Sequence, residues 1–191
     1  MEFFELKSFY IVTDIKEHKE NKLKLLRSID AMPQASIDNG VEVTSKTDWN
    51  IPQNYQREYL DIFYDMIRPY MQEMVERLKC ERWSIQNAWY QGYDKGGRHD
   101  WHTHPEANYT NVYYLSLPNK SIKTQLYDVV GESIVENIEV EEGQMLTFPA
   151  SVIHRSPVNE IDESNNWWPF KNKIDRKIVI SFNSNFNSPV M

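Results

Sequence analysis

The sequence predicts a mostly β fold, an all-β sandwich or barrel with N-terminal helices packed on one sheet. Two observations predict it. Short β-rich runs follow one another closely over residues 83–186, separated by turn signals such as Gly96-Gly97 and Glu142-Gly143. A long amphipathic helix precedes them, and a helix layer against a sheet layer is a common way to bury both apolar faces.

The N-terminal part, residues 1–82, is expected to support the sheet. Residues 3–12 are predicted to form a strand, residues 21–29 a short helix, and residues 30–53 a polar, turn-rich connection. The clearest helix covers residues 53–78, where apolar side chains recur every three or four positions: Leu60, Phe63, Ile67, Tyr70, Met74 and Leu78. Pro69 predicts a kink or a split within this helix.

The C-terminal part, residues 83–186, is expected to form the catalytic core of a single domain that spans residues 1–191. Period-two patterns and β-branched or aromatic residues predict its strands, at residues 84–90, 101–104, 110–117, 124–128, 133–140, 144–148 and 176–183.

The composition excludes several classes of protein. The formal net charge is −7, with 21 Lys and Arg against 28 Asp and Glu, so we expect no nucleic-acid partner. Cys80 is the only cysteine and cannot form an internal disulfide; we expect a small buried thiol. The N-terminus has no basic region of a signal peptide, and no stretch approaches the roughly 20 apolar residues of a membrane span. We therefore expect a cytoplasmic protein without a membrane partner.

The histidines carry the strongest functional signal. The chain has five, and His99, His102 and His104 fall within six residues of one another. Because side chains two apart on a strand share a face, His102 and His104 can bind one metal ion. His154 follows after several predicted strands, and a barrel can return it to the first pair. Imidazole suits Fe, Zn, Cu and Ni.

The ligand types favour an open catalytic site over structural zinc. Two histidines and one carboxylate leave three positions open, which suits Fe(II) with a 2-oxo acid and O₂. Asp100 and Glu106 share the strand parity of the histidine pair and can supply a carboxylate, although Pro105 is expected to end the strand. The several cysteines of a zinc finger are absent.

Three segments together resemble the 2-oxoglutarate/Fe(II)-dependent oxygenases, particularly prolyl-4-hydroxylase-like proteins. They are YDKGGRHDWHTHPEANYTNVYYLSLP, EEGQMLTFPASVIHRSPV and RKIVISFN. The resemblance covers residues 83–186 and implies a double-stranded β-helix, a jelly-roll or cupin-like fold. The H-x-H-P pattern, in place of the usual H-x-D, is similar to a subgroup of phage and marine bacterial oxygenases. A phage origin would place the protein in the host cytoplasm.

The resemblance implies roles for individual residues. His102, His104 and His154 are expected to bind Fe(II), with His104 at the usual carboxylate position. Arg176 is expected to pair with the far carboxylate of 2-oxoglutarate, since Arg binds carboxylates through two parallel hydrogen bonds. We expect the same carboxylate to accept hydrogen bonds from Tyr93, His99 and Tyr113, or its pocket to be lined by them. For each tyrosine, ordinary packing in the sheet is the alternative.

The implied activity is hydroxylation of a prolyl residue or a free amino acid, with O₂ as co-substrate and succinate and CO₂ as products. Two alternatives remain open. One is a cupin-type, three-histidine dioxygenase of a small thiol, and the other is a non-catalytic β-sandwich module that binds a structural metal or none. The insert over residues 156–175, with Trp167 and Trp168, is expected to be a substrate lid or an anchored surface loop. The sequence does not identify the substrate or the oligomeric state.

Overall fold

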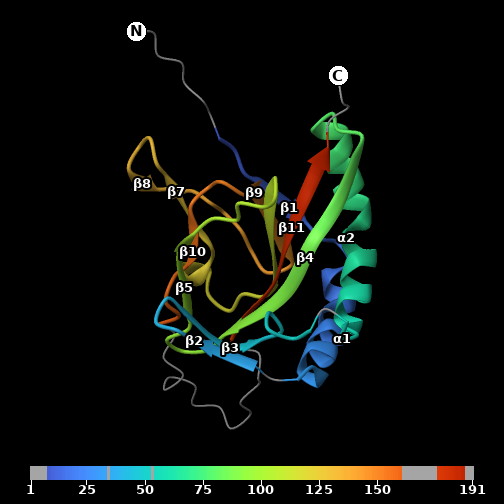
Figure 1. Cartoon of the computed structure of the whole chain (residues 1–191), viewed down its shortest axis with the longest axis vertical. Helices are drawn as coiled ribbons and strands as arrows, with labels where there is room; N and C mark the ends of the chain where they lie inside the picture. The colour runs from blue at the N-terminus through green and yellow to red at the C-terminus, as the bar shows by residue number, and fades with distance from the viewer. Residues whose placement is uncertain (1–7, 34, 53, 161–175, 188–191) are drawn as a thin grey trace.

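A curled antiparallel sheet with two helices on one side forms the architecture of the chain (Figure 1). The computed structural model describes residues 8–33, 35–52, 54–160 and 176–187. The mostly β fold predicted from the sequence is confirmed. Neither of the two α-helices in these ranges is long and apolar enough to cross a bilayer.

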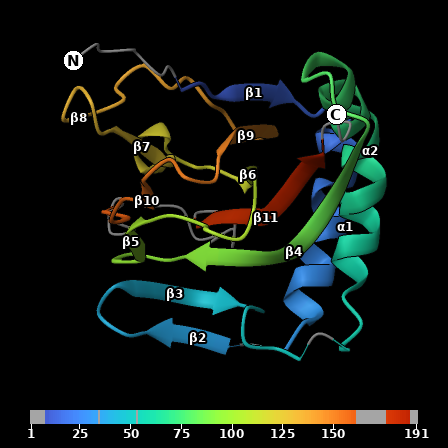
Figure 2. The same cartoon turned by 45° about the horizontal axis from the view of Figure 1, so that its top comes forward.

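The strands pair in an order that differs from their order in the sequence. Five strands lie beside one another along the half of the sheet nearer the helices: β1 (Ile11–Asp14), β9 (Gln144–Pro149), β6 (Tyr109–Ser116), β11 (Lys177–Asn187) and β4 (Arg82–Tyr93). The other half contains four strands: β5 (Arg98–His102), β10 (His154–Ser156), β7 (Gln125–Asp128) and β8 (Ser133–Ile134). Figure 2 shows these halves on opposite sides of the molecule's interior.

Strand β3 (Glu42–Thr47) joins the two halves of the sheet. Its C-terminal end pairs with β4, Lys46 opposite Gly92, and its N-terminal end pairs with β5, Glu42 opposite His99. Its other neighbour is β2 (Ala35–Asp38). Because one strand pairs with both halves, the sheet curls around an interior, as expected for a double-stranded β-helix.

Helices α1 (His18–Ala31) and α2 (Glu58–Arg77) cover the outer face of the larger half (Figure 1). The core between helices and sheet includes Phe63, whose ring packs against Tyr113 and Phe182. Both predicted helices are confirmed, although α2 begins later than predicted. Pro69 lies within α2 without splitting it.

Successive residues of β6 face different cores. Tyr113 belongs to the core beneath the helices, whereas Val112 and Tyr114 belong to a second core inside the curled sheet with Leu146 and Phe148. This alternation follows from the period of two in a strand. It decides which side chains of β6 can reach the interior.

The hairpin formed by β2 and β3 was not predicted. Its sequence, around Glu42–Thr47, is polar and has no alternation of apolar and polar residues, which is the signal used to identify a strand. Strand β10 is only three residues long and was also missed, and the strand predicted over residues 133–140 covers only Ser133–Ile134. The first strand begins at Ile11; residues 1–7 lie outside the described ranges.

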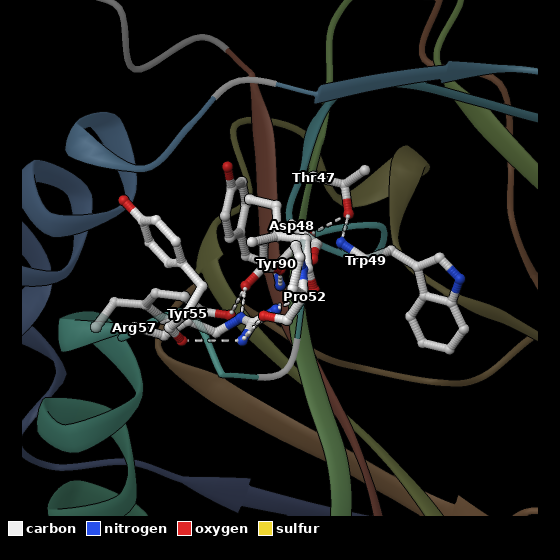
Figure 3. A network of polar contacts seen from close by, with 9 residues as sticks. Thr47, Asp48, Trp49, Pro52, Tyr55, Arg57 and Tyr90 are labelled. Atoms are coloured by element: carbon white, nitrogen blue, oxygen red, sulfur yellow. Dashed lines mark hydrogen bonds and ion pairs between the residues drawn. The ribbon is translucent and has the colours of Figure 1, made fainter.

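A buried ionic network fixes the segment that follows β3 (Figure 3). The Asp48 carboxylate is buried, pairs with Arg57 Nε at 2.8 Å and accepts hydrogen bonds from the Tyr59 hydroxyl and the Tyr90 main chain. The network therefore ties the end of β3 to α2 and β4. It also holds the next residue, Trp49, whose main-chain N–H donates to Thr47 Oγ1.

Candidate metal centre

Three histidines converge at one end of the curled sheet. One ligand nitrogen from each of His102, His104 and His154 can be chosen so that all three lie within 4.8 Å of one another. Strand pairing explains the convergence: in the β5–β10 ladder His154 lies directly opposite His102, and their ring centroids are 4.2 Å apart. His104 follows the end of β5, where its N–H donates to the Ala150 carbonyl.

The Nδ1 atom of each ring contacts the protein. His102 Nδ1 lies 2.6 Å from the Asp100 carbonyl oxygen, and His154 Nδ1 lies 3.0 Å from that of Val152. A carbonyl only accepts, so both rings carry their proton on Nδ1 and present Nε2 with its lone pair. His104 Nδ1 lies 3.2 Å from Asn183 Nδ2. Such contacts to the other ring nitrogen are common for histidines that bind metals.

Burial keeps these imidazoles neutral. It lowers the pKa of His102 and His154, and it lowers that of His104 to about 4, with neighbouring rings adding to the effect on His104 and His154. A metal ion binds the neutral ring, so near pH 7 it does not have to compete with the formation of imidazolium. The cluster is therefore prepared for a cation.

His99 lies beside the cluster. Its ring stacks on that of His102, with centroids 3.8 Å apart, and burial lowers its pKa to about 4. It is not part of the group of three nitrogens. The opposite residue on β3, Glu42, accepts hydrogen bonds from Gln91 and Thr44.

Neither candidate carboxylate joins the histidines. Asp100 and Glu106 are absent from the group of ligand atoms found among the described residues. Asp100 contributes its main-chain carbonyl to His102, and Glu106 is exposed in the turn after Pro105. The three-histidine set is the one that the geometry brings together.

The histidines line a cavity inside the curled sheet. Its walls combine polar side chains with a few apolar ones: Gln91, Tyr93, Thr110, Thr124, Arg155, Ser156, Lys177, Ser181, Trp89, Val112 and Val179. Tyr93 and His99, both expected near the cofactor, are part of this lining. Tyr113 is not, because it faces the helices, where its hydroxyl lies 2.7 Å from His18 Nδ1.

Lys177 brings a cation into this cavity. Its side chain is 1% exposed, and its ammonium donates to the Ile122 carbonyl at 2.6 Å and to Ser156 Oγ at 2.8 Å. The rings of Tyr93 and Tyr114 lie 5.2 and 6.0 Å from it. Burial lowers the pKa of Lys177 to about 7. No carboxylate in the described part of the chain pairs with this ammonium, and a buried cation usually has an anionic partner.

Arg176, the residue expected to bind 2-oxoglutarate, lies elsewhere. It precedes the first residue of β11, and its Nε is 3.5 Å from Asp94 Oδ1 outside the cavity lining. Neighbouring residues of an extended chain point in opposite directions, so only one of Arg176 and Lys177 can face the interior. Parity with Val179 and Ser181, which also line the cavity, is the sequence signal that identifies Lys177.

An aromatic wall borders the cavity next to His104. The Trp89 ring lies 5.9 Å from the His104 ring and packs edge-on against Trp49 at 4.6 Å. Trp89 is almost fully buried, whereas Trp49 is 49% exposed. The wall therefore extends from the histidines to the surface. Trp167 and Trp168, the candidate lid residues, lie outside the described residues.

Comparison with known proteins identifies similar folds only. No protein-family model and no curated protein matches the sequence. A Pseudomonas putida prolyl-4-hydroxylase has a TM-score of 0.62 at 11% identity, covering 95% of this chain and 93% of that one. A 2OG-Fe(II) oxygenase family oxidoreductase from Burkholderia pseudomallei has a TM-score of 0.65 at 8% identity, with coverages of 94% and 87%. The viral collagen prolyl hydroxylase of Paramecium Bursaria Chlorella virus-1 has a TM-score of 0.54 at 13% identity, with coverages of 92% and 95%.

Proposed function

We propose that this chain is a non-haem Fe(II)- and 2-oxoglutarate-dependent oxygenase that hydroxylates an amino-acid residue. The observation that supports it most strongly is one cavity lined by both the three-histidine cluster and a buried ammonium. The likeness of the fold to solved oxygenases, including prolyl hydroxylases, is a second support. A structural zinc site would not need an internal cation beside it.

The three imidazoles fit Fe(II). Each can offer a neutral nitrogen, and imidazole is a good ligand for Fe(II). Bound iron supplies O₂ activation, with 2-oxoglutarate as the reductant that is converted to succinate and CO₂. Because all three ligands are neutral, His102, His104 and His154 leave the full +2 charge of the metal in the cavity. That charge favours an anionic co-substrate.

Lys177 is proposed to hold the far carboxylate of 2-oxoglutarate, the role that the resemblance gave to Arg176. A Lys ammonium has three protons, and two are donated to Ile122 and Ser156. The third is available to a ligand in the cavity. The polar side chains of Thr124 and Tyr93 line the same cavity and can complete the carboxylate site.

The substrate is proposed to approach along the aromatic wall of Trp49 and Trp89. The wall reaches from solvent to His104, and a tryptophan ring offers a broad apolar surface on which another apolar ring can pack. A prolyl residue within a peptide or protein has such a ring without the charges of a free amino acid. We therefore favour a peptidyl substrate, with proline as the first candidate.

The H-x-H-P motif supports a place in the phage and marine bacterial subgroup. We propose a cytoplasmic location, where a single thiol such as Cys80 stays reduced.

The test is succinate release by the Fe(II)-loaded protein with 2-oxoglutarate, with and without proline-containing peptides. We expect peptide-stimulated succinate formation that His154→Ala abolishes. Equal turnover by His154→Ala would refute the proposal. Calorimetry with 2-oxoglutarate separates this function from a thiol dioxygenase, which would bind the small thiol and not the keto acid.

A further inference from the structure

We infer that Asn183 is the positioning residue of the third ligand, His104, and that its amide group turns over when the metal binds. The inference rests on the proposed metal centre. His104 stands where the H-x-D pattern would have a carboxylate, so this chain needs a way to orient an imidazole there. The side chain that contacts its ring comes from β11, far away in sequence.

The His104 ring is held differently from the other two. His102 and His154 each contact a main-chain carbonyl two residues earlier in the sequence. A carbonyl accepts hydrogen bonds only, so those two contacts fix the tautomer. His104 contacts an amide group, which can donate through Nδ2 or accept through Oδ1. Its tautomer therefore depends on the orientation of Asn183.

The orientation of the Asn183 amide in the structure matches a neutral His104 ring that carries its proton on Nε2. Asn183 Nδ2 faces His104 Nδ1 at 3.2 Å, while Asn183 Oδ1 accepts from Thr110 Oγ1 at 3.1 Å. An amide N–H that donates to Nδ1 requires the ring proton on Nε2. A metal bound at Nε2 displaces that proton, and the neutral ring must then carry its proton on Nδ1.

Thr110 makes the reversed orientation possible. A half-turn of the amide presents Oδ1 to the Nδ1–H of His104 and Nδ2 to Thr110 Oγ1. A hydroxyl both donates and accepts, so Thr110 can serve either orientation. Thr110 and Asn183 lie opposite each other in the β6–β11 ladder, and both side chains are buried, so water does not easily replace either partner.

The test measures Zn(II) binding in the absence of 2-oxoglutarate and substrate, by competition with a coloured chelator. Asn183→Leu keeps the size of the side chain and removes the acceptor; we expect about 10- to 100-fold weaker binding, the usual effect of losing such a partner. Asn183→Asp keeps an acceptor and should bind within about threefold of wild type or more tightly. Asn111→Leu is the matched control. Asn111 follows Thr110 on β6, and its replacement removes buried hydrogen bonds to Phe182, Ser184 and Thr147 without changing a contact to a histidine.

A spectroscopic readout needs no variant. In the Zn(II)-loaded wild-type protein labelled with ¹⁵N-histidine, long-range NMR correlations should show the His104 proton on Nδ1. Wild-type affinity in a folded Asn183→Leu variant, or a proton on Nε2 of His104 in the loaded protein, would overturn the inference. If wild type binds no Zn(II), the metal centre itself fails. If it binds while the Asn183 variants and the NMR disagree with expectation, only the role of Asn183 fails.

Discussion

Replacing Lys177 by Met removes the one lysine among the described residues that line the cavity, leaves the other cationic residue of the lining, Arg155, in place, and nearly preserves the volume of the side chain. Lys177 is buried and donates to Ile122 and Ser156, so the substitution gives up two protein contacts and the proposed contact to 2-oxoglutarate. Burying a cation opposes folding, and a Met side chain is apolar. We therefore expect the variant to fold, with a melting temperature equal to or above that of wild type.

The expected loss of 2-oxoglutarate affinity follows from one charge-assisted hydrogen bond. Such a bond contributes about 1.5–3 kcal/mol. Because about 1.4 kcal/mol corresponds to a factor of ten, Lys177→Met should raise the Kd of 2-oxoglutarate by about 10- to 150-fold. The assay is anaerobic calorimetry on Mn(II)-loaded protein, which binds the keto acid without turnover.

Arg176→Met is the matched control for Lys177→Met. The two residues are adjacent, and Arg176 contacts Asp94 outside the cavity lining. We expect its removal to change the Kd by less than about twofold, since a partly exposed ion pair outside the cavity contributes little to binding inside it. A large loss of affinity in Arg176→Met, with none in Lys177→Met, would refute the assignment and return the role to Arg176.

Three further predictions concern pH and stability. Burial lowers the pKa of Lys177 to about 7, and only the protonated ammonium pairs with a carboxylate. The affinity for 2-oxoglutarate should therefore hold between pH 6 and 7 and fall by up to about tenfold per pH unit above that range. Calorimetry at pH 6.5 and 8.5 checks this, and a pH-independent Kd would contradict it. Phe63→Ala should lower the free energy of unfolding in urea by about 3–5 kcal/mol, because it leaves a cavity in the core between α2 and the sheet. Leu23→Ala, at an exposed site, should change the same free energy by less than about 0.5 kcal/mol. Equal losses in the two variants would contradict this. Asp48→Asn should lower the same free energy of unfolding by about 3–5 kcal/mol, because it leaves the largely buried Arg57 cation without its anionic partner. An unchanged midpoint of urea unfolding would show that the ion pair is dispensable.

Strand periodicity explains which parts of the site were predictable. The spacing of His102 and His104 puts both rings on one face, and the structure brings them together with His154. That convergence depends on the β5–β10 pairing, and β10 is too short to show a pattern of its own. A barrel can return His154 to the pair, but the resemblance to a known family is what gave His154 its role as a metal ligand.

A shift of one residue separates Arg176 from Lys177. The sequence predicted a strand at residues 176–183, but it did not fix which parity faces the interior, since both faces of that strand are buried. The same limit applies to Tyr113, which alternation turns toward the helices. In each case the decisive fact is the packing of both faces of the sheet.

Contacts between strands distant in sequence lay beyond prediction. Asn183 on β11 meets His104, which follows β5, and Trp49 meets Trp89 because β3, the second strand of the β2–β3 hairpin, pairs with β4. The polar sequence of that hairpin gave no strand signal. Such contacts arise from the topology and not from any local pattern.

The most direct test of the account is the metal content and affinity of the purified protein. Wild type reconstituted anaerobically with Fe(II) and desalted should hold one iron per chain. Single substitutions of His102, His104 or His154 by Ala should each lose it, while His18→Ala, at the first residue of α1 and outside the cluster, should retain it. One iron per chain in the His154→Ala variant, or none in wild type, would contradict the proposed centre.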